Sequence, residues 1–244
     1  MFFFRKKSIV LDCFTTDHTA HALTPIASST NYYPDWWRQL PKTIKQEGQF
    51  WDTGTMKHCR GFTDYYANGI TIPMWTDLSA VIGSLRNPGI MCQFADKTSD
   101  AVSHPKAQRG NYLPDEQFGH VKLVSPWAFR TKEDINFAWT HPVWNYNSYD
   151  FTVLPAVTNY KYQNTTHVNM VVQYQLDGRI VNINANQPLV NLLPMTERKV
   201  EIKNHLIDEL EMKKIRQPSA VFVGNYRFRK ERLITQEKKC PFKW

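Results

Sequence analysis

The fold class is indicated by one stretch, VNMVVQYQLDGRIVNINA, which covers residues 168–185. The dipeptide Asp177-Gly178 is typical of a two-residue type I′ turn, and apolar and polar residues alternate on both sides of it. A hairpin closed by that turn pairs Leu176 with Arg179, Tyr174 with Val181, Val172 with Ile183 and Met170 with Ala185. One face of the predicted hairpin is therefore largely apolar and is expected to meet a core.

The opposite face of the same predicted hairpin is rich in amide side chains. Gln173 would stand opposite Asn182, and Val171 opposite Asn184. A ladder of Gln and Asn can bind a partner, and the alternative is a plain solvated face. We take Gln173, Asn182 and Asn184 as candidate partner-binding residues.

Short strand signals separated by Pro, Asn and Gly recur along the rest of the chain. They fall at residues 8–14, 69–75, 121–129, 135–139, 151–154, 157–162, 188–193 and 199–202. Pro34 and Pro41 bracket one expected short helix. This pattern predicts a mainly β protein, with an antiparallel β-sandwich or jelly-roll-like body over residues 1–203. Residues 96–116 are expected to form a long surface loop.

Residues 204–244 are predicted to form a helical, basic C-terminal end. Asn204 is expected to cap a helix over residues 205–216, and a second helix is expected over residues 227–239. Residues 198–244 contain 13 Lys and Arg against 6 Asp and Glu, whereas residues 1–197 contain 17 against 16. Most of the net charge of +8 therefore belongs to this end.

The second of these helices lacks a well-formed apolar face. We predict that it belongs to an arm ordered by contact with a partner, because ordering a segment without packing costs conformational entropy. A solvated helical surface is the alternative. The expected apolar anchors are Phe228, Leu233 and Trp244, and the basic residues expected to meet DNA or an acidic protein are Arg227, Arg229, Lys230 and Arg232.

Recognisable catalytic motifs are missing from the sequence. No Gly-x-Ser-x-Gly, Walker loop or dinucleotide fingerprint occurs, and the four Cys residues show no Cys-x-x-Cys spacing. A weak metal signal comes from His18 and His21, and His167 begins a predicted strand. The sequence therefore predicts no enzyme and no cofactor, with a metal-dependent β-barrel enzyme using His18, His21 or His167 as a minor alternative.

The chain also lacks signals for a membrane or for export. No apolar run reaches the roughly 18 residues of a membrane span, and the apolar start precedes Arg5, Lys6 and Lys7, the reverse of a secretory signal. An intracellular protein is expected. The composition includes 33 aromatic residues, which favour a β core, although exposed Trp side chains could stack on a sugar ring or a base.

Several short blocks occur in a characteristic order. They read PDWW at 34–37, KHCRGFTDY at 57–65, GITIPMW at 69–75, VSPWAFRTKE at 124–133, HPVWN at 141–145, LPAVTNY at 154–160, QPLV at 187–190 and LPMTERKV at 193–200. This order resembles a family of uncharacterised proteins of T4-like tailed phages, especially cyanophages, and more distantly a bacterial domain family of unknown function. The resemblance covers about residues 9–210 and brings no catalytic residues.

The resemblance implies a phage virion structural or accessory protein, in the head, neck or tail. Its expected partners are other virion proteins, including copies of itself, and its expected location is the host cytoplasm during assembly and then the virion. The alternative is a non-virion ligand-binding protein that takes a sugar or a nucleotide in the infected cell.

Overall fold

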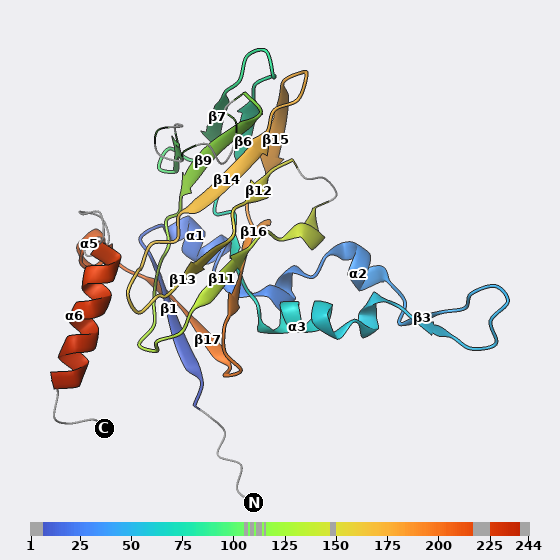
Figure 1. The fold of residues 1–244 in the computed structure, drawn as a ribbon, viewed down its shortest axis with the longest axis horizontal. Coiled ribbons are helices and arrows are strands. Elements are labelled where there is room, and N and C mark those ends of the chain that lie inside the picture. The colour runs from blue at the N-terminus through green and yellow to red at the C-terminus, as the bar shows by residue number, and fades with distance from the viewer. Residues whose placement is uncertain are drawn as a thin grey trace, which may run out of the picture.

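A computed structural model describes residues 7–104, 107, 110, 114, 116–146, 150–216 and 225–239. The fold is mainly β, with several antiparallel sheets and short helices, so the predicted class of a β-sandwich-like body is confirmed. Figure 1 shows the sheets gathered in a central body, one arm projecting from one side and the C-terminal helices on the other side.

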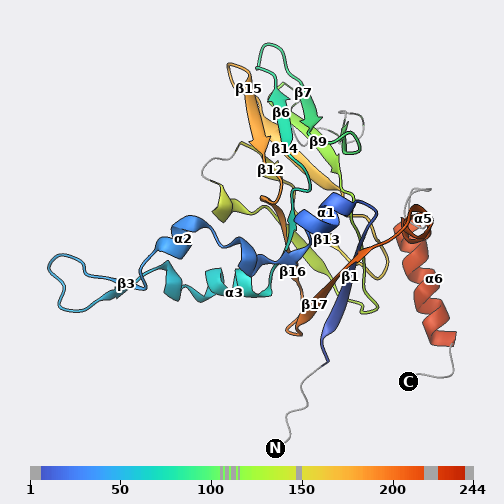
Figure 2. The same cartoon turned by 180° about the vertical axis from the view of Figure 1, so that it is seen from behind.

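The first and the last strand of the chain lie in one three-stranded sheet. Its central strand β1 (Ile9–Thr15) is antiparallel to β10 (Ala128–Arg130) and parallel to β17 (Val200–Leu206). The predicted first and last strands are thus confirmed, but β17 is longer than expected and pairs in parallel with β1. Figure 2 shows α1 (His18–Leu23) beside these two strands.

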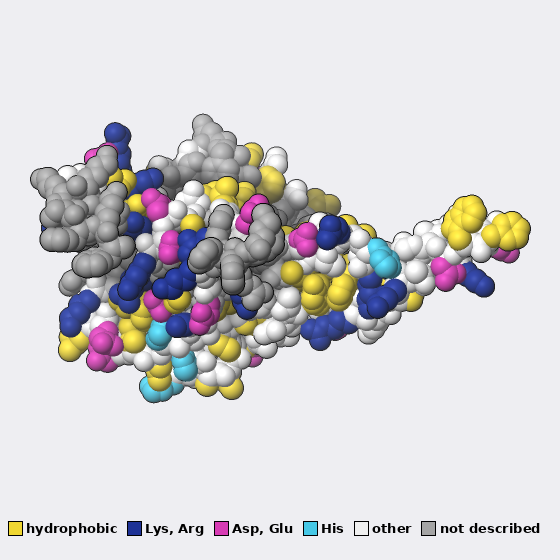
Figure 3. Space-filling model, turned by 90° about the horizontal axis from the view of Figure 1, so that it is seen from below, with side chains coloured by type: hydrophobic (Ala, Val, Ile, Leu, Met, Phe, Trp, Pro, Cys, Tyr) yellow, Lys and Arg dark blue, Asp and Glu magenta, His cyan; other side chains and the backbone are white. Residues whose placement is uncertain are grey.

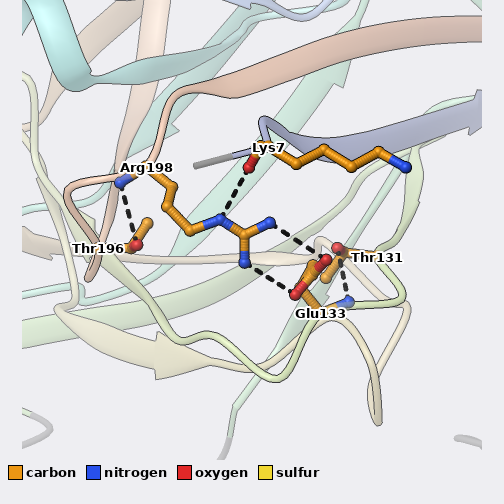
Figure 4. A network of polar contacts seen from close by, with 5 residues as sticks. All are labelled: Lys7, Thr131, Glu133, Thr196 and Arg198. Carbon is orange, nitrogen blue, oxygen red and sulfur yellow. Dashed lines mark hydrogen bonds and ion pairs between the residues drawn. The ribbon is translucent and has the colours of Figure 1, made fainter. Parts of the chain in front are cut away.

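A side-chain network ties this sheet to the neighbouring loops (Figure 4). Arg198 Nη1 and Nη2 donate to the two carboxylate oxygens of Glu133 at 3.0 and 3.3 Å, and Arg198 Nε donates to the carbonyl oxygen of Lys7 at 2.9 Å. The hydrogen bond from Arg198 lowers the pKa of Glu133. Residues 124–133 and 193–200, two of the sequence blocks quoted above, therefore meet at a bidentate ion pair.

The largest sheet has five antiparallel strands. Their order is β13 (Ala156–Thr158), β11 (Phe137–Thr140), β16 (Pro188–Pro194), β5 (Ile70–Pro73) and β2 (Ala27–Ser28). Pro73 pairs with Pro188, and the register shifts between Pro188 and Val190. The irregularity lies where two prolines face each other, and a proline has no N–H to donate to the ladder.

The predicted hairpin is wrong in its pairing. Strand β14 (Val168–Gln173) lies in a sheet with the order β12 (Thr152–Val153), β14, β9 (Phe118–Val124) and β8 (Asp100–Ser103). Strand β15 (Arg179–Ile183) instead pairs with β6 (Leu78–Ile82), which pairs with β7 (Ile90–Phe94). The expected pairs of Tyr174 with Val181 and of Gln173 with Asn182 therefore do not form.

The turn itself explains this error. A type I′ turn needs a positive φ at both central residues, and Gly178 lies outside the left-handed region. The chain turns a corner instead, where Arg179 Nη1 donates to the carbonyl oxygen of Gln173 at 2.7 Å. The predicted burial is nevertheless largely confirmed, since Met170, Val172, Val181 and Ile183 are all buried.

Two further expectations need correction. Residues 96–116 are not only a loop, because β8 lies within them and pairs with β9. Asn204 does not cap a helix: it lies in β17, where its Nδ2 donates to the carbonyl oxygen of Ile26 at 2.9 Å. Helix α5 (Glu209–Arg216) begins directly after Asp208 in the sequence. Asp208 caps it, because its Oδ1 accepts from the Glu211 N–H at 2.8 Å. The longer ladder with β1 outweighs the local capping signal at Asn204.

The core of the body is one contiguous cluster of buried side chains that draws on all four larger sheets. Trp75, Trp127, Phe129, Phe137 and Tyr160 are among its largest members. Helix α5 packs on the body through Met212, and Arg216 donates to the carbonyl oxygen of Ser125 at 3.1 Å. None of the described helices is long and apolar enough to cross a membrane.

Candidate functional site

The most prominent feature of the surface is an arm formed by residues 29–68, which projects from the body (Figures 1 and 3). It contains helix η1 (Ser29–Tyr32), α2 (Asp35–Gln39), β3 (Thr43–Ile44), β4 (Thr53–Gly54), η2 (Met56–His58) and α3 (Arg60–Asn68). The short helix expected between Pro34 and Pro41 is confirmed as α2. The β3–β4 hairpin forms the outer end, and Gly48 turns its tip with a φ of 82°.

Large apolar side chains stand exposed at this tip. Phe50 is 100% exposed, Trp51 is 71% exposed and Ile44 is 40% exposed. Figure 3 shows a hydrophobic group at the end of the arm. Exposed apolar side chains scattered singly are ordinary, but neighbouring aromatic side chains at the end of a projection mark an interaction site.

The arm is stiffened by an aromatic cluster along its inner half. The Tyr33 ring lies 4.1 Å from the Trp37 ring and 4.6 Å from the Tyr66 ring, and the rings of Phe62 and Tyr66 lie 4.9 Å apart. Lys57 Nζ lies 5.1 Å from the centre of the Trp37 ring. Each such aromatic pair contributes about 0.5–1.5 kcal/mol beyond the area it buries, so α2 with the preceding Tyr33 is held against α3 by packing.

Hydrogen bonds fix the arm to the body. Tyr66 Oη donates to Asn145 Oδ1 at 2.8 Å, and Asn145 Nδ2 donates to the carbonyl oxygen of Tyr32 at 2.6 Å. Asn191 Nδ2, from strand β16, donates to Tyr65 Oη at 2.9 Å. The arm therefore has a defined direction relative to the sheets.

A pocket of about 480 Å³ lies where the arm meets the body. We call it the junction pocket. Three segments far apart in the sequence form its walls: the base of the arm, helix η3 (Val143–Asn145) with Tyr146, and the turn before β16. Its lining residues are Asn31, Tyr32, Tyr33, Pro34, Asp35, Trp36, Arg38, Gln39, Trp144, Asn145, Tyr146, Asn186, Gln187 and Pro188.

The aromatic side chains that line the junction pocket are fixed by hydrogen bonds from their N–H and O–H groups. Trp36 Nε1 donates to the carbonyl oxygen of Trp144 at 3.0 Å, and Tyr146 Oη donates to the carbonyl oxygen of Pro188 at 2.6 Å. Tyr32 Oη donates to Asn186 Oδ1 at 2.9 Å. Burial raises the pKa of Tyr32 to about 12, so its hydroxyl group stays protonated and remains a donor at neutral pH.

The amide residues predicted as a partner-binding face are all exposed, but they do not form one ladder. Asn182 pairs with Ser79, which pairs with Gln93, and a shallow hollow of about 300 Å³ lies beside Asn182 and Asn184. Gln173 lies in the other sheet and pairs with Phe118. Binding of a partner by these residues stays a prediction.

The predicted C-terminal arm is described only in part, as helix α6 (Asn225–Lys239). Phe228 is 67% exposed, Arg227 and Arg232 are exposed, and Leu233 is half-buried. Lys230 Nζ lies 5.6 Å from the centre of the Tyr162 ring of the body. The side chain of Arg229 and all of Trp244 lie outside the described residues, so the predicted anchoring role of this arm stays a prediction.

The histidines of the weak metal signal lie on two different parts of the fold, because His18 and His21 belong to α1 and His167 directly precedes β14. His18 and His21 lie on α1, whose first turn is capped by Asp17: its Oδ1 accepts from Thr19 N–H at 2.8 Å. Burial and the neighbouring Arg216 and Lys122 lower the pKa of His167 to about 4, which makes its surroundings unfavourable for a cation. Across the part of the chain that the structure describes, no three His, Cys, Asp or Glu side chains gather to hold a metal ion.

Sequence reasoning missed the arm and the junction pocket as sites. Nothing in the local sequence distinguishes the exposed Trp36, Trp51 and Trp144 from the core residues Trp75 and Trp127. No protein-family model matches the chain, and no curated protein is significantly similar to it. What the protein does must therefore be inferred from its own residues.

Proposed function

We propose that this chain is a structural or accessory subunit of a tailed-phage particle and that it binds neighbouring subunits through its projecting arm. The phage context comes from the resemblance of the sequence blocks. The observation that supports a role in assembly is the arm tip, where Phe50 and Trp51 stand in solvent at the end of a segment that is anchored to the body.

Binding through the arm tip is favoured energetically because Phe50 and Trp51 would leave water when a partner covers them. Burying an aromatic side chain of this size contributes about 1.5–3 kcal/mol, and Trp is enriched among residues that dominate binding at interfaces. Because the arm is held by aromatic packing and hydrogen bonds, a partner would not need to order it first, which favours tight binding. The expected partners are other particle proteins, including further copies of this chain.

The C-terminal end offers a second contact in the same function. Helix α6 exposes Phe228 together with Arg227 and Arg232, which suits an acidic protein surface or DNA. In this proposal the protein is located in the host cytoplasm during assembly and in the particle afterwards.

Mass spectrometry of purified particles tests the proposal directly. We expect the chain at a stoichiometric level in the particle fraction, and its absence there would refute the proposal. A double variant, Phe50→Ser with Trp51→Ser, should fold normally yet be lost from the particle. The matched control is Leu23→Ser, which removes a 68% exposed apolar side chain from α1 and should be incorporated as the unaltered chain is.

A further inference from the structure

Two Trp side chains that line the junction pocket, Trp36 and Trp144, stay partly exposed. The polar edge of Trp36 is occupied by the carbonyl oxygen of Trp144, and the two rings pack at 6.3 Å with an angle of 50° between their planes. Trp36 is 39% exposed and Trp144 is 41% exposed, so a substantial part of each ring still contacts solvent. Both rings also pack on Phe62, which holds them in place. Such rings can receive a flat, partly apolar group without rearranging.

Around these rings lie polar groups with unused hydrogen-bonding capacity. Asn186 accepts from Tyr32 through Oδ1, and Gln187 accepts from the Asn184 N–H through Oε1 at 2.9 Å. With the residues that the structure describes, Asn186 Nδ2, Gln187 Nε2 and the Asp35 carboxylate make no hydrogen bond. The pocket therefore offers two amide donors and one acceptor beside the aromatic rings.

The backbone keeps one of these donors in position. Asn186 has a φ of 65°, a left-handed conformation that Asn adopts more readily than most residues. Its N–H donates to the carbonyl oxygen of Met74 at 2.8 Å. Asn186 is thus fixed twice, because its backbone N–H bonds to Met74 and its side-chain Oδ1 bonds to Tyr32.

The charges of the pocket point to a neutral ligand. Among the described residues that line the pocket, only Asp35 and Arg38 are charged, and they carry opposite signs. Arg38 is largely engaged with backbone, since Nε donates to the carbonyl oxygen of Tyr33 and Nη2 to that of Asn31, both at 3.0 Å. A phosphate group would find little positive charge to bind, which disfavours a nucleotide.

We propose that the junction pocket binds a carbohydrate, with one sugar ring packed on Trp144 and Trp36 and with its hydroxyl groups bound by Asn186, Gln187 and Asp35. A pyranose ring has an apolar C–H face and a rim of hydroxyl groups, which matches aromatic faces bordered by amides and a carboxylate. A volume of about 480 Å³ is within the range of small-ligand pockets and accommodates one or two sugar units. This inference is independent of the proposed role in a phage particle.

Saturation-transfer difference NMR on the full chain tests this proposal, because it detects weak binding without labels. The free probes are glucose, galactose, N-acetylglucosamine and maltose, the surface probe is the polysaccharide of purified bacterial lipopolysaccharide, and the nucleotide probe is AMP. We expect transfer to the ring protons of at least one carbohydrate. Transfer to a free sugar or to the polysaccharide distinguishes a soluble ligand from a cell-surface glycan.

Two variants assign the signal to the pocket. Trp144→Ala should weaken binding at least about tenfold. Asn186→Asp keeps the acceptor for Tyr32 and tolerates the left-handed backbone but replaces the amide donor, so it should weaken binding by a similar factor while the protein stays folded. Trp51→Ala removes an exposed Trp outside the pocket and should change nothing. Absence of transfer to every carbohydrate, transfer to AMP alone, or equal binding by Asn186→Asp would overturn the proposal.

Discussion

Tyr66 donates its hydroxyl hydrogen to Asn145 Oδ1 over 2.8 Å, and this bond joins α3 of the arm to η3 of the body. Tyr66 is fully buried, and Asn145 passes the connection on to the backbone of Tyr32. Asn145 therefore helps to set the direction of the arm, together with the bond from Asn191 to Tyr65, and with it the position of the aromatic tip and the shape of the junction pocket.

Asn145→Ala should loosen the arm. The substitution leaves the hydroxyl group of Tyr66 and the carbonyl oxygen of Tyr32 without their partner, and one such loss costs about 1–3 kcal/mol. Hydrogen exchange should accelerate across residues 29–68 while β14 and β16 keep their protection. Asn68→Ala is the control, because Asn68 Nδ2 bonds only within α3, to the carbonyl oxygen of Asp64. Equal exchange in the two variants would contradict the proposed anchoring.

The double variant Phe50→Ser, Trp51→Ser should keep the stability of the unaltered chain. Phe50 is fully exposed and Trp51 is largely exposed in the isolated protein, so the free energy of unfolding should change by less than about 0.5 kcal/mol. Urea denaturation provides the measurement. A larger loss would mean that the tip packs on its own body, and the assembly role assigned to it would then be wrong.

Acid should destabilise the protein through two half-buried histidines, His141 and His167. Burial lowers the pKa of His141 to about 4, and burial with Arg216 and Lys122 lowers that of His167 to about 4. Between pH 6.5 and 4 the unfolded chain binds more protons than the folded one, so stability rises with pH and is lost as the pH falls. With a pKa of about 4 in the folded chain, each group should account for at most about 2 kcal/mol between pH 7 and pH 5, and solvent screening at these partly exposed sites reduces that figure.

His141→Asn isolates one of these contributions. An Asn oxygen can replace His141 Nδ1, which accepts from the Val153 N–H at 3.4 Å, but it does not titrate. The variant should be less stable at pH 7, because the ring contacts with Tyr146 and Phe151 are lost, and its stability should fall less steeply toward pH 5. His18→Asn makes the same substitution at an exposed residue of α1 and controls for the chemical change itself. An unchanged slope in His141→Asn would contradict the assignment.

Gly83→Ala should be strongly destabilising, whereas Gly89→Ala should not. A Cβ at Gly83 would meet the carbonyl oxygen of Asn87, and it would lie 2.9 Å from the backbone nitrogen of Gly89, so the turn after β6 must shift. Such overpacking costs about 1–3 kcal/mol. A Cβ at Gly89 meets nothing within 4 Å. Thermal unfolding of the two variants should separate them clearly, and equal melting temperatures would show that the turn rearranges freely.

Helix α6 should exchange its amide hydrogens rapidly in the isolated protein. Phe228 is exposed on this helix, and Lys230 Nζ lies 5.6 Å from the centre of the Tyr162 ring of the body. Hydrogen exchange over residues 227–236 measures this. Strong protection in a monomer would mean that α6 docks on its own body, and the predicted partner-dependent arm would be wrong.

The sequence alone determined which residues face the core in several strands. Met170, Val172, Val181 and Ile183 are buried as their alternation predicts, although β14 and β15 do not pair with each other. Alternation is a local property of an extended chain, because successive side chains point to opposite faces whatever strand lies alongside. The helix between Pro34 and Pro41 was predictable for the same reason, since proline restricts its own backbone and that of the preceding residue.

Only the tertiary structure decided which strands pair and which aromatic residues stay in water. Asn204 has the chemistry of a helix cap, yet the ladder between β1 and β17 keeps it in a strand. Trp127 is buried and Trp51 is exposed, although both are Trp residues in short blocks bounded by polar residues. Burial depends on what the rest of the chain brings into contact, and the junction pocket joins residues near 36, 144 and 186 that no sequence spacing relates. Local preferences were therefore readable from the sequence, whereas the sites were set by long-range packing.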